Sequence, residues 1–167
     1  MNIEDCFENA QKKAVAALFA LDFVKGTPTK MRGLDGWVFE QVVRNGLEQE
    51  MRKKKVKSEI AEQVSIGGRA KVDLVIGCVA IETKLSGYYD DVEERYKGYR
   101  KRIEKMGLTY FYVTLYEKYL PNLKAAHRVY GKDRVFVLSE SGAWGRFAFA
   151  FIKQLRKKPS LTSESGG

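Results

Sequence analysis

Residues 71–84 read KVDLVIGCVAIETK, two runs of six residues separated by the pair Gly77-Cys78. Both runs are rich in β-branched residues, and a pair that begins with glycine suits a two-residue hairpin turn. If that pair is the whole loop, counting back from it places Asp73 directly opposite Glu82. The segment therefore predicts an antiparallel hairpin with two carboxylates at one level.

Side chains alternate between the two faces of a strand, so this hairpin should have one polar and one apolar face. We expect Asp73, Glu82 and Lys84 to share the polar face. The residues expected on the apolar face are Val72, Leu74, Ile76, Ile81 and Thr83. Carboxylates on opposed positions repel each other, so this face requires open water, a raised pKa or a divalent cation.

A hard cation such as Mg²⁺ or Mn²⁺ binds one or two carboxylates together with water. A lysine two residues along the same face is placed to position or deprotonate a metal-bound water, or to stabilise charge in a transition state. The pattern of Asp73, Glu82 and Lys84 thus predicts a hydrolytic metal site. The alternative is an exposed sheet face that carries ordinary charges.

A helix is expected over about 35–54, and Glu40 falls within its apolar stripe. A charge in such a stripe should face the body of the protein, where it is costly unless it is paired or bound to a metal. Glu40 is therefore a candidate third carboxylate of the site. A boundary residue that reaches water is the alternative, and Glu50 ranks second.

Glu62 is a possible additional site residue, and its position depends on the turn before the hairpin. If Gly67-Gly68 is a two-residue turn, Glu62 lies opposite Asp73. Three neighbouring strands would then carry one acidic row, formed by Glu62, Asp73 and Glu82.

The rest of the chain alternates between helical and strand patterns. Helices are expected at 3–23, 35–54, 90–106, 121–131 and 144–157, and strands at 59–66, 70–76, 79–85, 108–116 and 134–138. This order predicts an α/β fold, a central mixed sheet of about five strands flanked by helices. We expect a single domain over 1–158, comprising an N-terminal helix at 1–24, a catalytic core at 35–138 and a C-terminal helix at 144–158, and a disordered tail at 159–167.

The 167 residues carry a formal charge of +9, which favours a polyanionic partner such as nucleic acid. No apolar run is long enough to span a membrane, and the polar N-terminus does not read as a secretory signal. We therefore expect no membrane partner and a cytoplasmic location, or the host cytoplasm if the source is a virus. Two cysteines without paired spacing and a single histidine argue against a zinc site.

Basic residues follow the hairpin on the helix expected at 90–106. Arg95, Arg100 and Lys101 are candidate phosphate contacts, and a solvated helix face is the alternative. Tyr88, just before this helix, is a candidate for stacking on an unpaired base. A role in loop packing is the alternative for Tyr88.

An acidic residue on one strand followed by Glu-x-Lys on the next resembles the signature of the PD-(D/E)XK, or restriction-endonuclease-like, nuclease superfamily. Here those residues are Asp73 and Glu82-Thr83-Lys84, and Glu40 matches a helix glutamate that the family often places upstream. The resemblance extends over about 35–116 and departs from the family signature at Val72, which replaces a proline that family members often lack.

The resemblance implies a restriction-endonuclease-like fold and a catalytic Mg²⁺. The ligands it implies are Asp73, Glu82 and the backbone carbonyl of Thr83. It further implies that Glu40 assists in holding the metal, directly or through water, and that Lys84 lies near the attacking water.

The size and charge are similar to those of small archaeal or viral nucleases and Holliday junction resolvases within that superfamily. We therefore expect a Mg²⁺- or Mn²⁺-dependent nuclease that hydrolyses DNA phosphodiester bonds. No separate sequence-reading segment is evident, which favours an endonuclease directed at DNA structure. The alternatives are a non-cleaving nucleic-acid-binding protein on the same fold and a nuclease subunit active only in a larger assembly. RNA stays open as a substrate, as does a homodimer built on the helix at 3–23.

Overall fold

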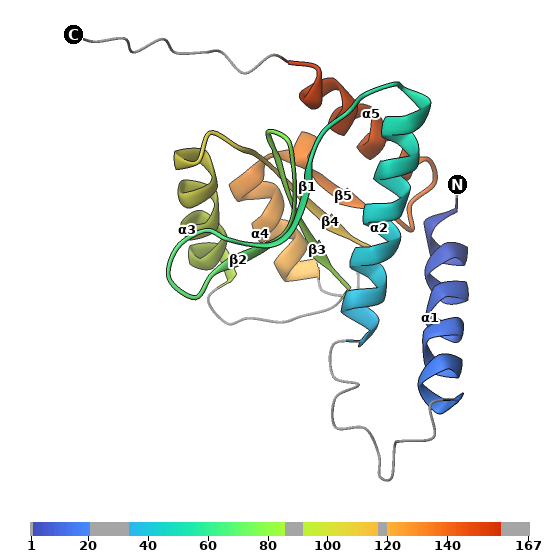
Figure 1. Cartoon of the computed structure of the whole chain (residues 1–167). Coiled ribbons are helices and arrows are strands. Elements are labelled where there is room, and N and C mark those ends of the chain that lie inside the picture. Colours follow the sequence, from blue (N-terminus) through green and yellow to red (C-terminus); the bar gives the residue numbers. More distant parts are fainter. Residues whose placement is uncertain (1, 21–33, 86–91, 117–119, 158–167) are drawn as a thin grey trace, which may run out of the picture.

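The computed structural model describes residues 2–20, 34–85, 92–116 and 120–157 (Figure 1). Within these residues the protein is an α/β fold with one five-stranded mixed sheet and five α-helices. The elements are α1 (Ile3–Ala20), α2 (Leu34–Lys53), β1 (Ile60–Ser65), β2 (Lys71–Ile76), β3 (Val79–Lys84), α3 (Val92–Lys105), β4 (Thr109–Thr114), α4 (Leu120–Tyr130), β5 (Val135–Val137) and α5 (Ala143–Leu155). The expected order of elements is confirmed. The expected end of the first helix, at 23, lies outside the described residues, and the other ends shift by at most two residues. The tail at 159–167 and Tyr88 lie outside the described residues.

The strands lie side by side in chain order, β1-β2-β3-β4-β5. The first three form an antiparallel meander, whereas β4 and β5 run parallel to β3. Helix α3 connects β3 to β4, and α4 connects β4 to β5, because parallel neighbours require a crossover. Among the described helices, none has the length and apolar character that a membrane span needs.

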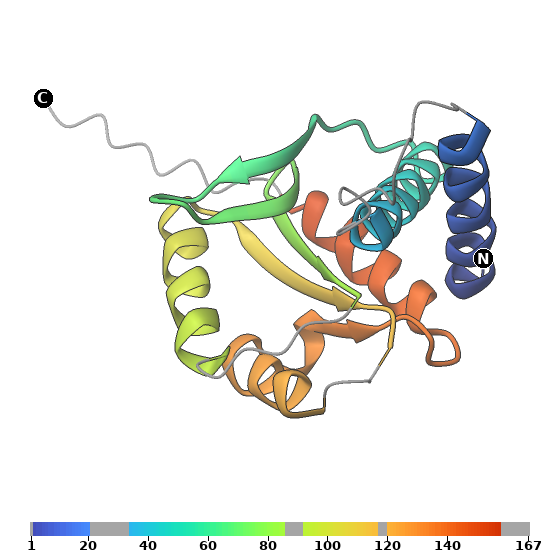
Figure 2. The ribbon, with the colours of Figure 1, turned by 90° about the horizontal axis from the view of Figure 1, so that it is seen from below.

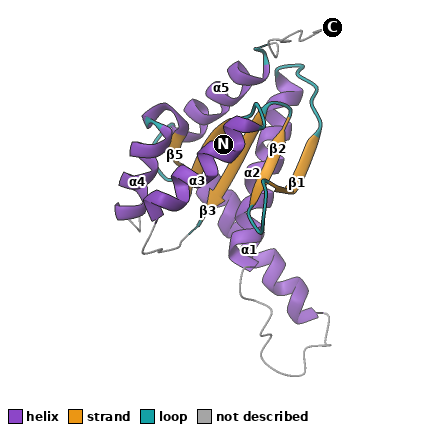
Figure 3. Ribbon diagram, turned by 90° about the vertical axis from the view of Figure 1, so that its left-hand side faces the viewer, coloured by secondary structure: helices purple, strands orange, loops and turns teal. Residues whose placement is uncertain are grey.

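Helices cover both faces of the sheet (Figures 2 and 3). One core lies between the sheet and α2 and α5, with α1 packed outside α2. The other lies between the sheet and α3 and α4. Strand β4 is buried on both faces, with Tyr110 and Tyr112 in the α3–α4 core and Phe111 and Val113 in the α2–α5 core. Its continuous apolar run is typical of a central strand in such a layered fold.

The turn between β2 and β3 is the one that the sequence predicts. Ile76 pairs with Val79, so Gly77-Cys78 is the whole loop, and Gly77 adopts a φ of +56°. A glycine takes that left-handed conformation without strain. The register places Asp73 level with Glu82, one step beyond the last ladder pair, Leu74 with Ile81.

The turn between β1 and β2 differs from the expectation. The amide of Ile66 donates to the carbonyl of Ala70 at 3.0 Å, so three residues form the loop instead of two. Gly67 and Gly68 both have positive φ, +105° and +61°. A glycine pair is compatible with either loop length, and the longer loop shifts β1 by one residue against β2.

The alternation of faces also breaks in β2. Leu74 and Ile76 lie in the α2–α5 core, whereas Val72 lies in the α3–α4 core. On β1 at the same level, Gln63 has a φ of +51°, and the pair of Gln63 and Asp73 is skipped between regular pairs on either side. The expectation that Val72 shares a face with Leu74 and Ile76 is wrong, because both strands change faces at this irregular pair.

Candidate active site

A cleft of about 620 Å³ opens between the start of α2, the middle of β1 and β2 and the end of β3, and we call it the acidic cleft. Its lining residues are Asp35, Gly36, Trp37, Glu40, Glu62, Gln63, Asp73, Thr83, Lys84 and Leu85. Of the residues that the sequence singles out for catalysis, Glu40, Asp73 and Lys84 line this cleft. Residues far apart in the chain are therefore gathered at one concave place.

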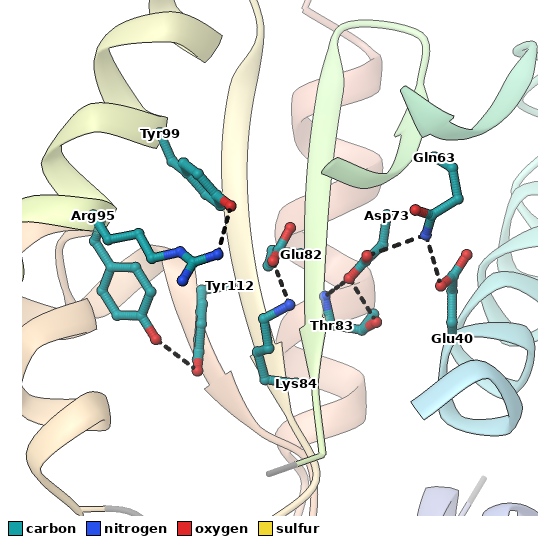
Figure 4. Close-up of polar contacts among 10 residues, drawn as sticks. Glu40, Gln63, Asp73, Glu82, Thr83, Lys84, Arg95, Tyr99 and Tyr112 are labelled. Atoms are coloured by element: carbon teal, nitrogen blue, oxygen red, sulfur yellow. Dashed lines mark hydrogen bonds and ion pairs between the residues drawn. The ribbon is translucent and has the colours of Figure 1, made fainter. Parts of the chain in front are cut away.

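A chain of hydrogen bonds crosses the acidic cleft from α2 to β3 (Figure 4). The Gln63 amide Nε2 donates to Glu40 Oε2 at 3.2 Å and to Asp73 Oδ1 at 3.3 Å. Asp73 Oδ2 in turn accepts from the backbone amide of Thr83 at 2.8 Å and from Thr83 Oγ1 at 3.0 Å. One amide side chain thus holds two carboxylates that would otherwise repel each other.

The bonds to Thr83 lie where the backbones of β2 and β3 diverge, and we call this place the fork. The backbone ladder ends at Leu74 and Ile81, and beyond it the Asp73 side chain satisfies the Thr83 amide. The amide and the carbonyl of one strand residue point to the same edge of the strand. The Thr83 carbonyl is therefore directed toward the same fork as the Asp73 carboxylate.

Glu82 is 3% exposed and forms an ion pair through Oε1 with the ammonium group of Lys84. Its second oxygen, Oε2, is buried and has no hydrogen-bond partner among the described residues. A buried acceptor without a partner carries a desolvation cost of roughly 1–3 kcal/mol, and more when it is charged. Glu82 therefore presents a strong oxygen ligand that the described residues do not satisfy.

The site residues form two neighbouring groups and not the single polar face that the sequence predicts. One group is the ion pair of Glu82 and Lys84, and the other is Asp73 with Gln63 and Glu40. Glu82 and Lys84 share a face of β3, as expected, whereas Asp73 reaches the edge of β3. The difference arises because β2 changes faces at Asp73. Within the described residues, no three acid, histidine or cysteine side chains are close enough to form a metal site by themselves.

The two groups are nevertheless coupled electrostatically. The pKa of Glu40 is raised from 4.5 to about 7, chiefly by burial and then by the charges of Asp73, Glu62 and Glu82. Burial likewise raises the pKa of Glu82 to about 7, opposed by Lys84 and reinforced by Asp73. Two neighbouring carboxyl groups that resist ionisation are typical of a place where a cation or a proton is bound.

Glu62 does not lie opposite Asp73, so the predicted acidic row is wrong. Because the preceding loop has three residues, Glu62 pairs with Leu74, and Gln63 takes the position level with Asp73. Glu62 still lines the acidic cleft, where it forms an ion pair with Arg44 at 2.8 Å. Gln63 is the site residue that the sequence did not predict. A turn of three residues after Ile66, in place of two, would have placed Gln63 opposite Asp73.

The expected phosphate contacts on α3 lie on different sides of the helix. Arg95 Nη2 donates a hydrogen bond to the Tyr99 hydroxyl at 3.5 Å (Figure 4). The Arg95 guanidinium carbon lies 5.8 Å from the centroid of the Tyr99 ring, and the charge of Arg95 lowers the pKa of Glu82, so Arg95 lies beside the site. Arg100 is instead held by Glu104 at 2.7 Å, and with Lys101 it lines a hollow between α3 and α4.

The runner-up carboxylate on α2, Glu50, does not belong to the site. It pairs with Lys53 at 2.9 Å near the end of the helix, outside the acidic cleft. The choice of Glu40 over Glu50 therefore agrees with the positions of the two side chains.

Comparisons of this chain with protein-family models, with curated proteins and with solved structures found no match.

Proposed function

We propose that this protein is a metal-dependent nuclease of the restriction-endonuclease-like type. The observation that carries the proposal is the fork between β2 and β3, where Asp73 meets Thr83 beside the pair of Glu82 and Lys84. The surrounding meander, crossover helix and parallel strand, together with buried Glu40 on α2, agree with the arrangement that the PD-(D/E)XK resemblance implies.

The donor set at the fork fits a hard divalent cation. Mg²⁺ and Mn²⁺ accept a few carboxylate and carbonyl oxygens and keep several waters, so a cluster of three acids is not required. Asp73, Glu82 and the Thr83 carbonyl would hold the ion, and the buried Glu82 Oε2 is an oxygen that needs such a partner. When bound, the cation supplies Lewis-acid stabilisation of phosphoryl oxygens and a more acidic water.

The side chains of this protein have separate tasks in the proposed reaction. Water adds to phosphorus and gives up one proton, the ester bond to the leaving oxygen breaks, and that oxygen takes up one proton. Lys84, held by Glu82, orients the attacking water and stabilises the negative charge that develops on the phosphoryl group. Glu40 acts through Gln63, which fixes the orientation of Asp73. Glu40 and Gln63 are therefore positioning residues.

Charge supports a nucleic acid as the substrate. The chain carries a net charge of +9, and Arg95 places a guanidinium group near Glu82. We propose DNA, cut internally and according to its structure. RNA stays open as a substrate. The non-cleaving nucleic-acid-binding protein and the nuclease subunit that is active only in a larger assembly also stay open, because each would use the same residues.

Cleavage of a substrate panel tests the proposal. Purified protein is incubated with single-stranded, duplex, flap and four-way DNA and with single-stranded RNA, in Mg²⁺, in Mn²⁺ and in EDTA. We expect cleavage of at least one substrate with metal and none in EDTA. Glu82→Gln should abolish it, whereas Glu59→Gln, at an exposed position before β1, should not. Metal-dependent cleavage that survives Glu82→Gln would contradict the assignment of the site.

A further inference from the structure

Trp37 is an exposed aromatic side chain at the acidic cleft. It is 55% exposed and lines the cleft together with Glu40 and Lys84. The other tryptophan, Trp144, is 7% exposed and belongs to the α2–α5 core. Tryptophan combines a large apolar ring with a polar N–H group, and it is enriched where a protein surface meets a partner.

The helix geometry directs Trp37 toward the site. Residues three apart on a helix are neighbours, so Trp37 lies beside Glu40 on α2. The next two residues, Val38 and Phe39, are buried in the core, which fixes the rotation of this first turn. Trp37 is therefore held by a packed helix at the wall of the acidic cleft.

We propose that Trp37 stacks on an unpaired nucleobase next to the bond that is cut, which makes a single strand or an unpaired nucleotide the preferred substrate. This inference rests on the proposed function, because it concerns the same cleft. A nucleotide offers a phosphate and an aromatic face, and the lining of the cleft offers the ammonium of Lys84 and the indole ring of Trp37. Bases within a duplex already stack on each other, so only an unpaired base presents its face to Trp37.

Binding to oligonucleotides tests the inference without any cleavage. The protein carries Asp73→Asn, which removes one cleft charge, and the buffer contains EDTA. The probes are single-stranded oligothymidine, the same strand with abasic sites, and a blunt duplex of equal length. Fluorescence anisotropy of a terminal label reports affinity, and unlabelled strands report quenching of the tryptophan emission.

Trp37→Ala should weaken binding of the oligothymidine by roughly 5- to 100-fold, the range expected for loss of one base–aromatic stack. Trp37→Phe should retain most of the affinity but lose the quenching, since only buried Trp144 then emits. The abasic strand and the duplex should be insensitive to both changes. Phe149→Ala, which removes an exposed aromatic ring on α5 outside the cleft, is the matched control and should change nothing.

Equal affinity of the parent protein and the Trp37→Ala variant for oligothymidine, or quenching that persists in Trp37→Phe, would overturn the inference. The inference would also be overturned if Trp37→Ala weakened binding of the duplex as much as it weakens binding of the single strand. Cleavage is scored separately in the protein with an intact Asp73. If the protein cleaves but Trp37 does not stack on a base, only this inference fails. If Trp37 stacks on a base but no metal supports cleavage, only the proposed nuclease function fails.

Discussion

The carboxylate of Asp73 accepts a hydrogen bond from the backbone amide of Thr83 at 2.8 Å, so a side chain of β2 continues the ladder after its backbone has diverged from β3. This contact holds the fork open and keeps a charged oxygen at its centre. It also makes Asp73 a structural residue as well as a proposed metal ligand, and substitutions can separate the two roles.

Asp73→Asn should keep the fold, because the amide oxygen of asparagine still accepts from Thr83. It should weaken the binding of metal, because the amide carries no negative charge. Asp73→Ala leaves the amide and the hydroxyl of Thr83 without this acceptor and should lower the free energy of unfolding by about 1–3 kcal/mol. Urea unfolding measures the stability, and calorimetry with Mn²⁺ measures the affinity. Equal stability of the two variants would show that the Thr83 contact does not support the fork.

Glu40→Gln should stabilise the metal-free protein at neutral and alkaline pH. The pKa of Glu40 is raised from 4.5 to about 7 in the folded state, so folding favours its protonated form and stability falls as pH rises between those two values. Removing the charge should restore about 2 kcal/mol at a pH of about 8, at about 1.4 kcal/mol per pKa unit reduced for solvent screening, and nothing below a pH of about 4.

Thermal unfolding across this pH range checks the slope for Glu40→Gln. Glu59→Gln, at an exposed position, is the control and should leave the pH dependence of stability as it is. A gain that does not depend on pH would contradict the assignment to Glu40 ionisation.

Mg²⁺ should raise the melting temperature more at high pH than at low pH. Glu82 must be ionised to bind the cation, and burial raises its pKa to about 7. The protein therefore binds metal in competition with a proton, and the stabilisation by ligand shrinks as pH falls through that value. Melting curves with and without Mg²⁺ at several pH values measure the effect. A metal-induced shift of equal size on both sides of neutrality would count against Glu82 as a ligand.

Gln63→Leu should move the acidic limb of the pH–rate profile to higher pH. The amide of Gln63 lowers the pKa of Glu40 by a hydrogen bond and separates it from Asp73, so its removal raises that pKa. Gln41→Leu, which alters a neighbouring amide that contacts Glu62, is the matched control. An unchanged profile with a reduced rate would assign Gln63 a purely structural role.

Arg95→Ala should weaken binding of nucleic acid and reduce the salt dependence of its affinity by about one phosphate contact. Arg100→Ala should leave the salt dependence unchanged, because Arg100 is engaged with Glu104 on the other side of α3. Titrations at several salt concentrations separate the two. The opposite ranking would place the nucleic acid on the α3–α4 side, away from the acidic cleft.

The hairpin at 71–84 could be predicted because its information is local. A single two-residue turn, Gly77-Cys78, sets the register, and alternation then places Glu82 and Lys84 on one face. The burial of Glu40 also follows from local periodicity, since its helix neighbours on the same stripe are apolar.

Other features depend on contacts that local patterns do not contain. The glycines before β2 permit two loop lengths, and the longer one replaces Glu62 by Gln63 opposite Asp73. The left-handed φ of Gln63 goes against the usual preference of a residue with a side chain, so no propensity indicates it. Trp37 becomes a cleft residue only once α2 packs against the sheet.

The central claim is that Lys84 and the carboxylates beside it hydrolyse phosphodiester bonds with a divalent cation. The most direct test compares cleavage rates of Lys84→Met and of Lys12→Met, an exposed lysine on α1, on the best substrate in Mg²⁺. We expect a loss of at least about 100-fold for Lys84→Met, the scale of one charge-stabilising group, and the parental rate for Lys12→Met. Cleavage by Lys84→Met at the parental rate would contradict it.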